Sequence, residues 1–132
     1  MCRAVLIASD RPLPLVAFNE ASPAFHVSEA APPCPRFTLP HQYYAGAHTG
    51  CGCGFDVSGH IAVEEGPATA SSRAALAAYL EAQLARGCKL EVLTGLDGDE
   101  EGPFAHSGEC TVSRLLEHVT GDWDRDFFTL IR

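Results

Sequence analysis

The chain has 132 residues, enough for a single globular domain over residues 1–132 that buries roughly two thirds of the surface of its unfolded form. Hydrophobic residues make up 46% of the chain and charged residues 20%, which argues against intrinsic disorder. The formal net charge is -8, and the nine Lys and Arg residues form no basic cluster, so we expect no nucleic acid as a partner.

The N-terminal residues MCRAVLIASD contain a short apolar run with no basic segment before it, which argues against a signal peptide. The sequence has no apolar stretch of about 18 residues, so we expect no membrane span. These features favour a cytoplasmic protein with reduced thiols, in which the six cysteines do not form a disulfide framework. An exposed edge strand or the Tyr43-Tyr44 pair would suit a homodimer.

The first half of the chain predicts short strands separated by turns. Residues 2–9 (CRAVLIAS) have the branched aliphatic side chains of a buried strand, and a second apolar stretch follows at 14–18 (PLVAF). A short strand around 24–29 (AFHVSE) precedes a proline-rich loop. Residues 36–48 predict another strand, and residues 55–65 predict a hairpin or a bulged strand.

The clearest element is a long amphipathic helix at about residues 71–86. Leucines recur there at i, i+4 and i+8 among alanines, with Ser71 or Ser72 as the N-cap. Gly87 is well placed to end the helix.

The rest of the chain predicts a strand, a second helix and a final strand. Residues 88–95 alternate in polarity, which places Glu91 on a solvent-facing side of a half-buried strand. Apolar residues at helical spacing predict a shorter helix at about 111–120, and FFTLI (127–131) predicts the last strand. The expected fold is therefore α+β, with a mixed or mainly antiparallel sheet covered on one face by helix.

The segment HTGCGCGF (48–55) carries the main candidate site, because glycines alternate with Cys51 and Cys53 downstream of His48. In an extended strand the two thiols would lie roughly 6.6–7 Å apart, whereas two sulfurs on one zinc ion lie roughly 3.8 Å apart. A shared metal therefore requires the backbone to bend between the cysteines, which the glycines allow. We predict a transition-metal site, with zinc as the expected ion, formed by His48, Cys51 and Cys53.

Two other interpretations of these cysteines stay open. Cys51 and Cys53 can be small buried side chains packed in a tight glycine turn. They can also form a redox pair in which His48 stabilises one thiolate and the other cysteine resolves the oxidised form. The usual redox signature, C-x-x-C at a helix N-terminus, is absent, because the residues after Cys53 predict a strand.

Cys2 is a separate candidate, because removal of Met1 would give its thiol an α-amino group as a base. The opening MCRAVLIASDRPLPLVAFNE resembles the start of the Asn-Arg-Asp-Glu family of N-terminal-nucleophile-like proteins, through Met1-Cys2, the apolar strand and Asn19-Glu20. The Arg-Asp pair between those last two residues is missing here. The resemblance implies a catalytic Cys2, whereas the alternative is a residue of the first strand.

Other polar residues are expected to have no catalytic role. His106 is placed in a loop and His118 near a helix end, and the acidic stretch DWDRD (122–126) is expected on the surface. No nucleophile elbow, phosphate-binding loop or H-E-x-x-H motif is present. The sequence therefore favours a zinc-binding or structural protein over an enzyme, with a thiol-based redox protein as the alternative.

Overall fold

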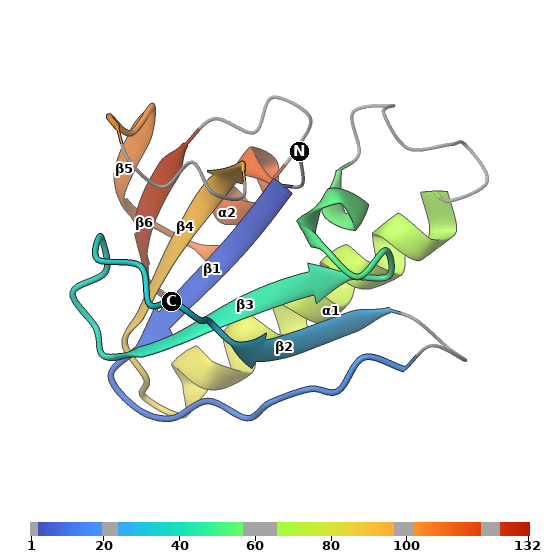
Figure 1. Cartoon of the computed structure of the whole chain (residues 1–132), viewed down its shortest axis with the longest axis horizontal. Coiled ribbons are helices and arrows are strands. Elements are labelled where there is room, and N and C mark those ends of the chain that lie inside the picture. The colour runs from blue at the N-terminus through green and yellow to red at the C-terminus, as the bar shows by residue number, and fades with distance from the viewer. Residues whose placement is uncertain (1–2, 20–23, 57–65, 97–101, 120–124) are drawn as a thin grey trace.

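The structure is an α+β arrangement of one six-stranded sheet and two α-helices, as the sequence predicts (Figure 1). It is a computed structural model that describes residues 3–19, 24–56, 66–96, 102–119 and 125–132. In chain order the elements are β1 (Arg3–Ser9), β2 (Phe25–Glu29), β3 (His41–Ala47), the 3-10 helix η1 (Gly52–Phe55), α1 (Gly66–Ala85), β4 (Leu90–Leu96), β5 (His106–Cys110), α2 (Val112–His118) and β6 (Asp126–Leu130).

The strand order across the sheet is β2-β3-β1-β4-β6-β5. All neighbouring strands are antiparallel except β5 and β6, which are parallel. Parallel neighbours require a crossover connection, and α2 lies within that connection. We call β5, α2 and β6 the βαβ unit. It occupies one end of the sheet, while β1 lies in the interior between β3 and β4 (Figure 1).

The larger part of the core lies between the sheet and the helices. Leu76 and Leu80 of α1 are fully buried there with Val5 and Ile7 of β1. A smaller apolar cluster lies on the opposite face, where Phe37 and its neighbours cover the outward side chains of β1. Burial on both faces explains why β1 is a continuous apolar run rather than an alternating one.

The start of α1 corrects the predicted helix of residues 71–86. The helix begins at Gly66 rather than Ser71, and Pro67 fits because the amide groups of the first turn have no intrahelical acceptor. Ser72 is not an N-cap. Ser72 is a buried residue within α1, and its hydroxyl donates to the carbonyl oxygen of Ala24 at 2.5 Å.

The other helix ends agree more closely with the predictions. Gly87 has a φ of 87° directly after α1, where the left-handed conformation favours glycine. The second helix, predicted at 111–120, runs from Val112 to His118. Thr111 is its N-cap, and its side chain accepts a hydrogen bond from the backbone of the first turn.

The predictions for the strands and the segments beside them have three further outcomes. The apolar stretch at 14–18 makes one isolated bridge, from Val16 to Val27 of β2. Most of the predicted hairpin, residues 57–65, lies outside the described residues. Glu91 is buried rather than solvent-facing, because the loop before β3 covers its side of the sheet. In the described part of the chain, no helix combines the length and apolar character that crossing a membrane requires.

Candidate metal site

The βαβ unit brings together three polar side chains that are distant in the sequence. His106 is the first residue of β5, Asp126 is the first residue of β6, and His118 ends α2. The parallel register pairs His106 with Asp126, so the starts of the two strands lie side by side. Because α2 returns the chain towards the start of β6, the last residue of α2 also lies at the end of the sheet where β5 and β6 begin.

Each oxygen of the Asp126 carboxylate faces one imidazole. Oδ1 lies 2.8 Å from Nδ1 of His106, and Oδ2 lies 3.4 Å from Nδ1 of His118. The two imidazole rings are 4.8 Å apart between centroids, and the His118 ring also packs against Phe128 at 4.9 Å. The side chain of Asp126 is 2% exposed, whereas that of His106 is 49% exposed. The cluster is therefore closed at the carboxylate and open to solvent at one histidine.

The buried Asp126 carboxylate requires a compensating positive charge. The structure gives it ion-pair contacts with the two histidines, and none with a Lys or Arg among the described residues. An ionised carboxylate away from water is costly unless it is paired with a cation or coordinates a metal. His106, His118 and Asp126 could hold a metal ion, since each offers a ligand atom and these atoms all lie within 4.8 Å of one another. No other set of three such residues meets this condition in the described ranges.

Cys110 ends β5 in the same unit, at the opposite end of the strand from His106, and it is not among the side chains that could hold the ion. Burial raises the pKa of the Cys110 thiol; Arg114 lowers that pKa in part, and the charge of Asp126 raises it. Cys110 packs at the periphery of the core.

The predicted site at His48, Cys51 and Cys53 lies between β3 and α1. Its backbone bends, as a shared metal would require, because Cys53 is within η1 rather than in a strand. The three side chains take separate contacts. The backbone N–H of Arg3 donates to Sγ of Cys53 at 3.4 Å, and Sγ of Cys51 lies 3.6 Å from the Thr49 hydroxyl.

His48 is oriented by a hydrogen bond to Ser72. The Ser72 hydroxyl donates its proton to Ala24, so Nδ1 of His48, at 3.1 Å from the same oxygen, is the donor. Nε2 then carries a lone pair, and this buried atom has no hydrogen-bond partner among the described residues. That tautomer suits a metal ligand. The zinc and redox hypotheses for Cys51 and Cys53 stay predictions, and the one group of possible metal ligands found among the described residues does not include these side chains.

The glycines of this segment have a packing role. A Cβ atom at Gly52 would lie 2.7 Å from the backbone oxygen of Arg3, and one at Gly54 would lie 2.7 Å from Cβ of Ala47. Any larger residue would push η1 away from β1 and β3. The close approach of backbones thus accounts for two of the alternating glycines without a ligand.

The sequence does not predict the cluster in the βαβ unit. The stretch DWDRD is expected on the surface, but Asp126 begins β6 with its side chain on the helix-covered face and is 1% exposed. His106 begins a strand rather than lying in a loop. The available signals are that His118 is placed near a helix end and that Asp126 directly precedes the predicted strand FFTLI. Cys2 lies outside the described residues.

Comparisons with known proteins found no family model, curated protein or solved structure that matches the chain. An α+β fold by itself is compatible with many unrelated activities. The function is therefore inferred from the chemistry of the βαβ unit.

Proposed function

We propose that the protein binds a divalent transition metal, with zinc as the expected ion, through His106, His118 and Asp126. The observation that carries this proposal is the buried carboxylate of Asp126, which is shared by two imidazoles and has no Lys or Arg partner among the described residues. Two histidines and one carboxylate are a common ligand set for zinc and for non-haem iron.

The distances within the cluster suit a small ion. Zinc bonds to nitrogen and oxygen are about 2.0–2.1 Å, so two such ligands on a tetrahedral ion lie about 3.3 Å apart. The distances of 2.8 Å and 3.4 Å from the Asp126 oxygens to the imidazole nitrogens lie on either side of that value. Small rotations of the imidazole rings would convert hydrogen-bond geometry into ligand geometry.

Three protein ligands leave the ion at least one open position. Because His106 is half-exposed, water has access to the site and would complete the coordination shell. The ion would also join the first residue of β5, the last residue of α2 and the first residue of β6. Binding is therefore expected to stabilise the native state by about 2.7 kcal/mol when free zinc is at about 100 times its dissociation constant.

The test is a titration of metal-free protein with zinc, followed by calorimetry. We expect one equivalent to bind to the unmodified chain. His118→Ala and Asp126→Asn should each weaken binding at least tenfold, since each removes a ligand. His41→Ala is the matched control, because His41 begins β3 outside the cluster, and its zinc affinity should equal that of the unmodified protein.

Two results would overturn the proposal. One is failure of the unmodified protein to bind zinc at micromolar concentrations, which would leave the cluster as a hydrogen-bonded structural feature. The other is full affinity in Asp126→Asn. Cys51→Ser separates the two candidate sites. If Cys51→Ser loses zinc binding while His118→Ala retains it, the metal binds at the segment around Cys53 instead.

A further inference from the structure

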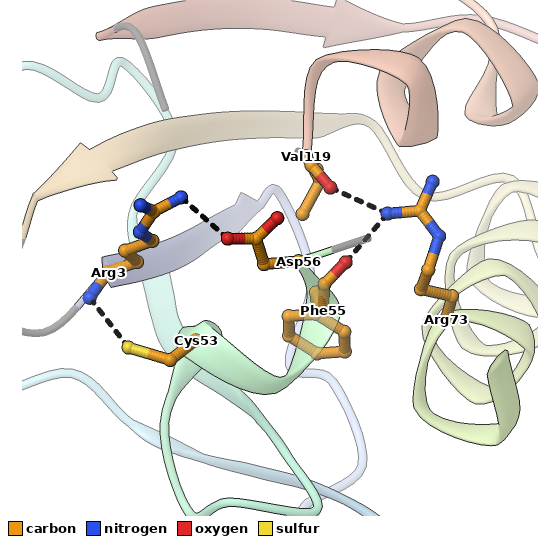
Figure 2. Close-up of polar contacts among 6 residues, drawn as sticks. All are labelled: Arg3, Cys53, Phe55, Asp56, Arg73 and Val119. Atoms are coloured by element: carbon orange, nitrogen blue, oxygen red, sulfur yellow. Dashed lines mark hydrogen bonds and ion pairs between the residues drawn. The ribbon is translucent and has the colours of Figure 1, made fainter. Parts of the chain in front are cut away.

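Arg73 of α1 reaches across to the end of α2 (Figure 2). Its Nη1 donates to the carbonyl oxygen of Val119 at 2.6 Å, and its Nη2 donates to that of Leu116 at 2.5 Å. The last carbonyl groups of a helix have no partner within the helix. One guanidinium group thus satisfies two carbonyls at the end of α2, and these two residues lie on either side of His118 in the sequence.

The position of His118 depends on the tertiary contacts of α2 because this helix is short. A helix of seven residues is not stable on its own, so its placement comes from such contacts. The side chain of Thr111 caps the first turn, at the end remote from His118. At the other end, Leu115 and Val119 pack in the core, and the side chain of Arg73 binds the backbone to α1.

Arg73 is itself held firmly. Its Nη1 also donates to the carbonyl oxygen of Phe55, the last residue of η1, at 2.8 Å. The next residue, Asp56, is buried and pairs with Nη1 of Arg3 at 3.0 Å (Figure 2). Burial lowers the pKa of Arg73 and Asp56 raises it, and an arginine stays charged under both influences. The guanidinium group is therefore a fixed, charged donor.

We propose that Arg73 is a positioning residue for the metal site, which it serves by fixing the last turn of α2 and with it the imidazole of His118. The inference rests on the proposed metal function. Metal sites require their ligands to be held within about 0.5 Å of the productive geometry. Loss of supporting contacts around metal ligands typically lowers metal affinity about 10–100-fold.

The test uses Co²⁺ as a spectroscopic substitute for zinc and compares three variants. Arg73→Gln removes the charged guanidinium group. Arg73→Lys keeps the charge but offers one ammonium group, which cannot reach the carbonyl groups of both Leu116 and Val119 as the two guanidinium nitrogens do. Arg11→Gln is the matched control, because Nη1 of Arg11 donates to the carbonyl oxygen of Arg86 beyond the end of α1, away from the site. Each variant is first checked for folding by circular dichroism.

We expect Arg73→Gln to bind Co²⁺ about tenfold more weakly and with a changed visible spectrum, since a displaced His118 alters the coordination. Arg73→Lys should fall between Arg73→Gln and the unmodified protein. Arg11→Gln should show the unmodified affinity and spectrum. The change in spectrum separates positioning from a general loss of stability, which would lower occupancy without changing the band shape.

The two proposals fail in different ways. If the unmodified protein binds no Co²⁺, the metal function fails and the role of Arg73 fails with it. If the unmodified protein binds Co²⁺ and Arg73→Gln has the same affinity and spectrum, only the positioning role is overturned. If Arg73→Gln does not fold, Arg73→Lys decides, and an unmodified affinity and spectrum in that variant would overturn the inference.

Discussion

Replacing Glu91 is expected to release the loop that covers the helix-free face of the sheet. The carboxylate is 6% exposed on β4 and accepts three hydrogen bonds from that loop. Oε1 accepts from the backbone N–H groups of Thr38 at 2.9 Å and Leu39 at 3.1 Å, and Oε2 accepts from the Thr38 hydroxyl at 2.6 Å. Glu91→Ala removes all three acceptor contacts at once.

The expected cost can be worked from these contacts. Hydrogen bonds to a charged group contribute about 1.5–3 kcal/mol each. The exposed Thr38 hydroxyl can bond to water in place of Oε2, so the net loss is assigned to the two backbone bonds, at the lower value each. Two bonds at about 1.5 kcal/mol lower the free energy of unfolding by about 3 kcal/mol in Glu91→Ala. Glu91→Gln keeps one acceptor oxygen for the backbone bonds but loses the charge and has an NH2 group in place of the other oxygen, so about 1 kcal/mol is expected.

Urea unfolding, with fluorescence as the signal, measures both values. A loss of about 3 kcal/mol should lower the unfolding midpoint by about 1–2 M urea. Glu109→Ala is the control, because Glu109 is an exposed strand glutamate, and a change of no more than about 0.5 kcal/mol is expected. Equal midpoints for Glu91→Ala and Glu109→Ala would refute the argument. Equal costs for Glu91→Gln and Glu91→Ala would show that the retained acceptor is not used.

Two further predictions concern the helix-covered face and the strand pair at the sheet edge. Burial raises the pKa of Tyr79 to about 12, and the Tyr79 hydroxyl donates to the carbonyl oxygen of Pro14 at 2.7 Å. The contribution of this side chain to stability is therefore present below pH 10 and is lost as the pH rises through 12. Spectrophotometric titration should show a tyrosine ionisation step near pH 12, and Tyr79→Phe should remove that step; an unchanged curve would contradict the assignment. A Cβ atom at Gly46 would lie 1.9 Å from the His26 ring, so Gly46→Ala should cost about 1–3 kcal/mol, measured by urea unfolding. In a His26→Ala background the same change should cost little, and an undiminished cost there would place the strain elsewhere.

The strands and the long helix could be predicted because their signals are local. The apolar run of β1 and the leucine repeat of α1 follow from burial alone, and Gly87 ends α1 because a left-handed residue is required there. The start of α1 could not be placed, because serines inside a helix look like N-caps when their buried contacts are unknown. Ser72 is the example, since its partners are His48, directly after β3, and Ala24, directly before β2.

The candidate site could not be predicted because it depends on pairing rather than on a motif. His106 and Asp126 meet only through the parallel register of β5 with β6, and strand order cannot be deduced from the local periodicity of the sequence. The acidic stretch DWDRD is typical of a surface segment, whereas the position of Asp126 at the start of β6 turns its side chain inward. The spacing of His48, Cys51 and Cys53 is visible in the sequence because these residues are close together in the chain, whereas the members of the cluster in the βαβ unit are distant from one another.

The interior position of β1 has a consequence for how the chain folds as it is synthesised. The first strand pairs with β3 on one side and with β4 on the other, so one of its edges stays open until residue 96 has left the ribosome. Contacts of such large sequence separation slow folding. An unpaired apolar edge is also prone to aggregate in a nascent chain. We therefore expect this edge of β1 to be exposed in the nascent chain until β4 is added.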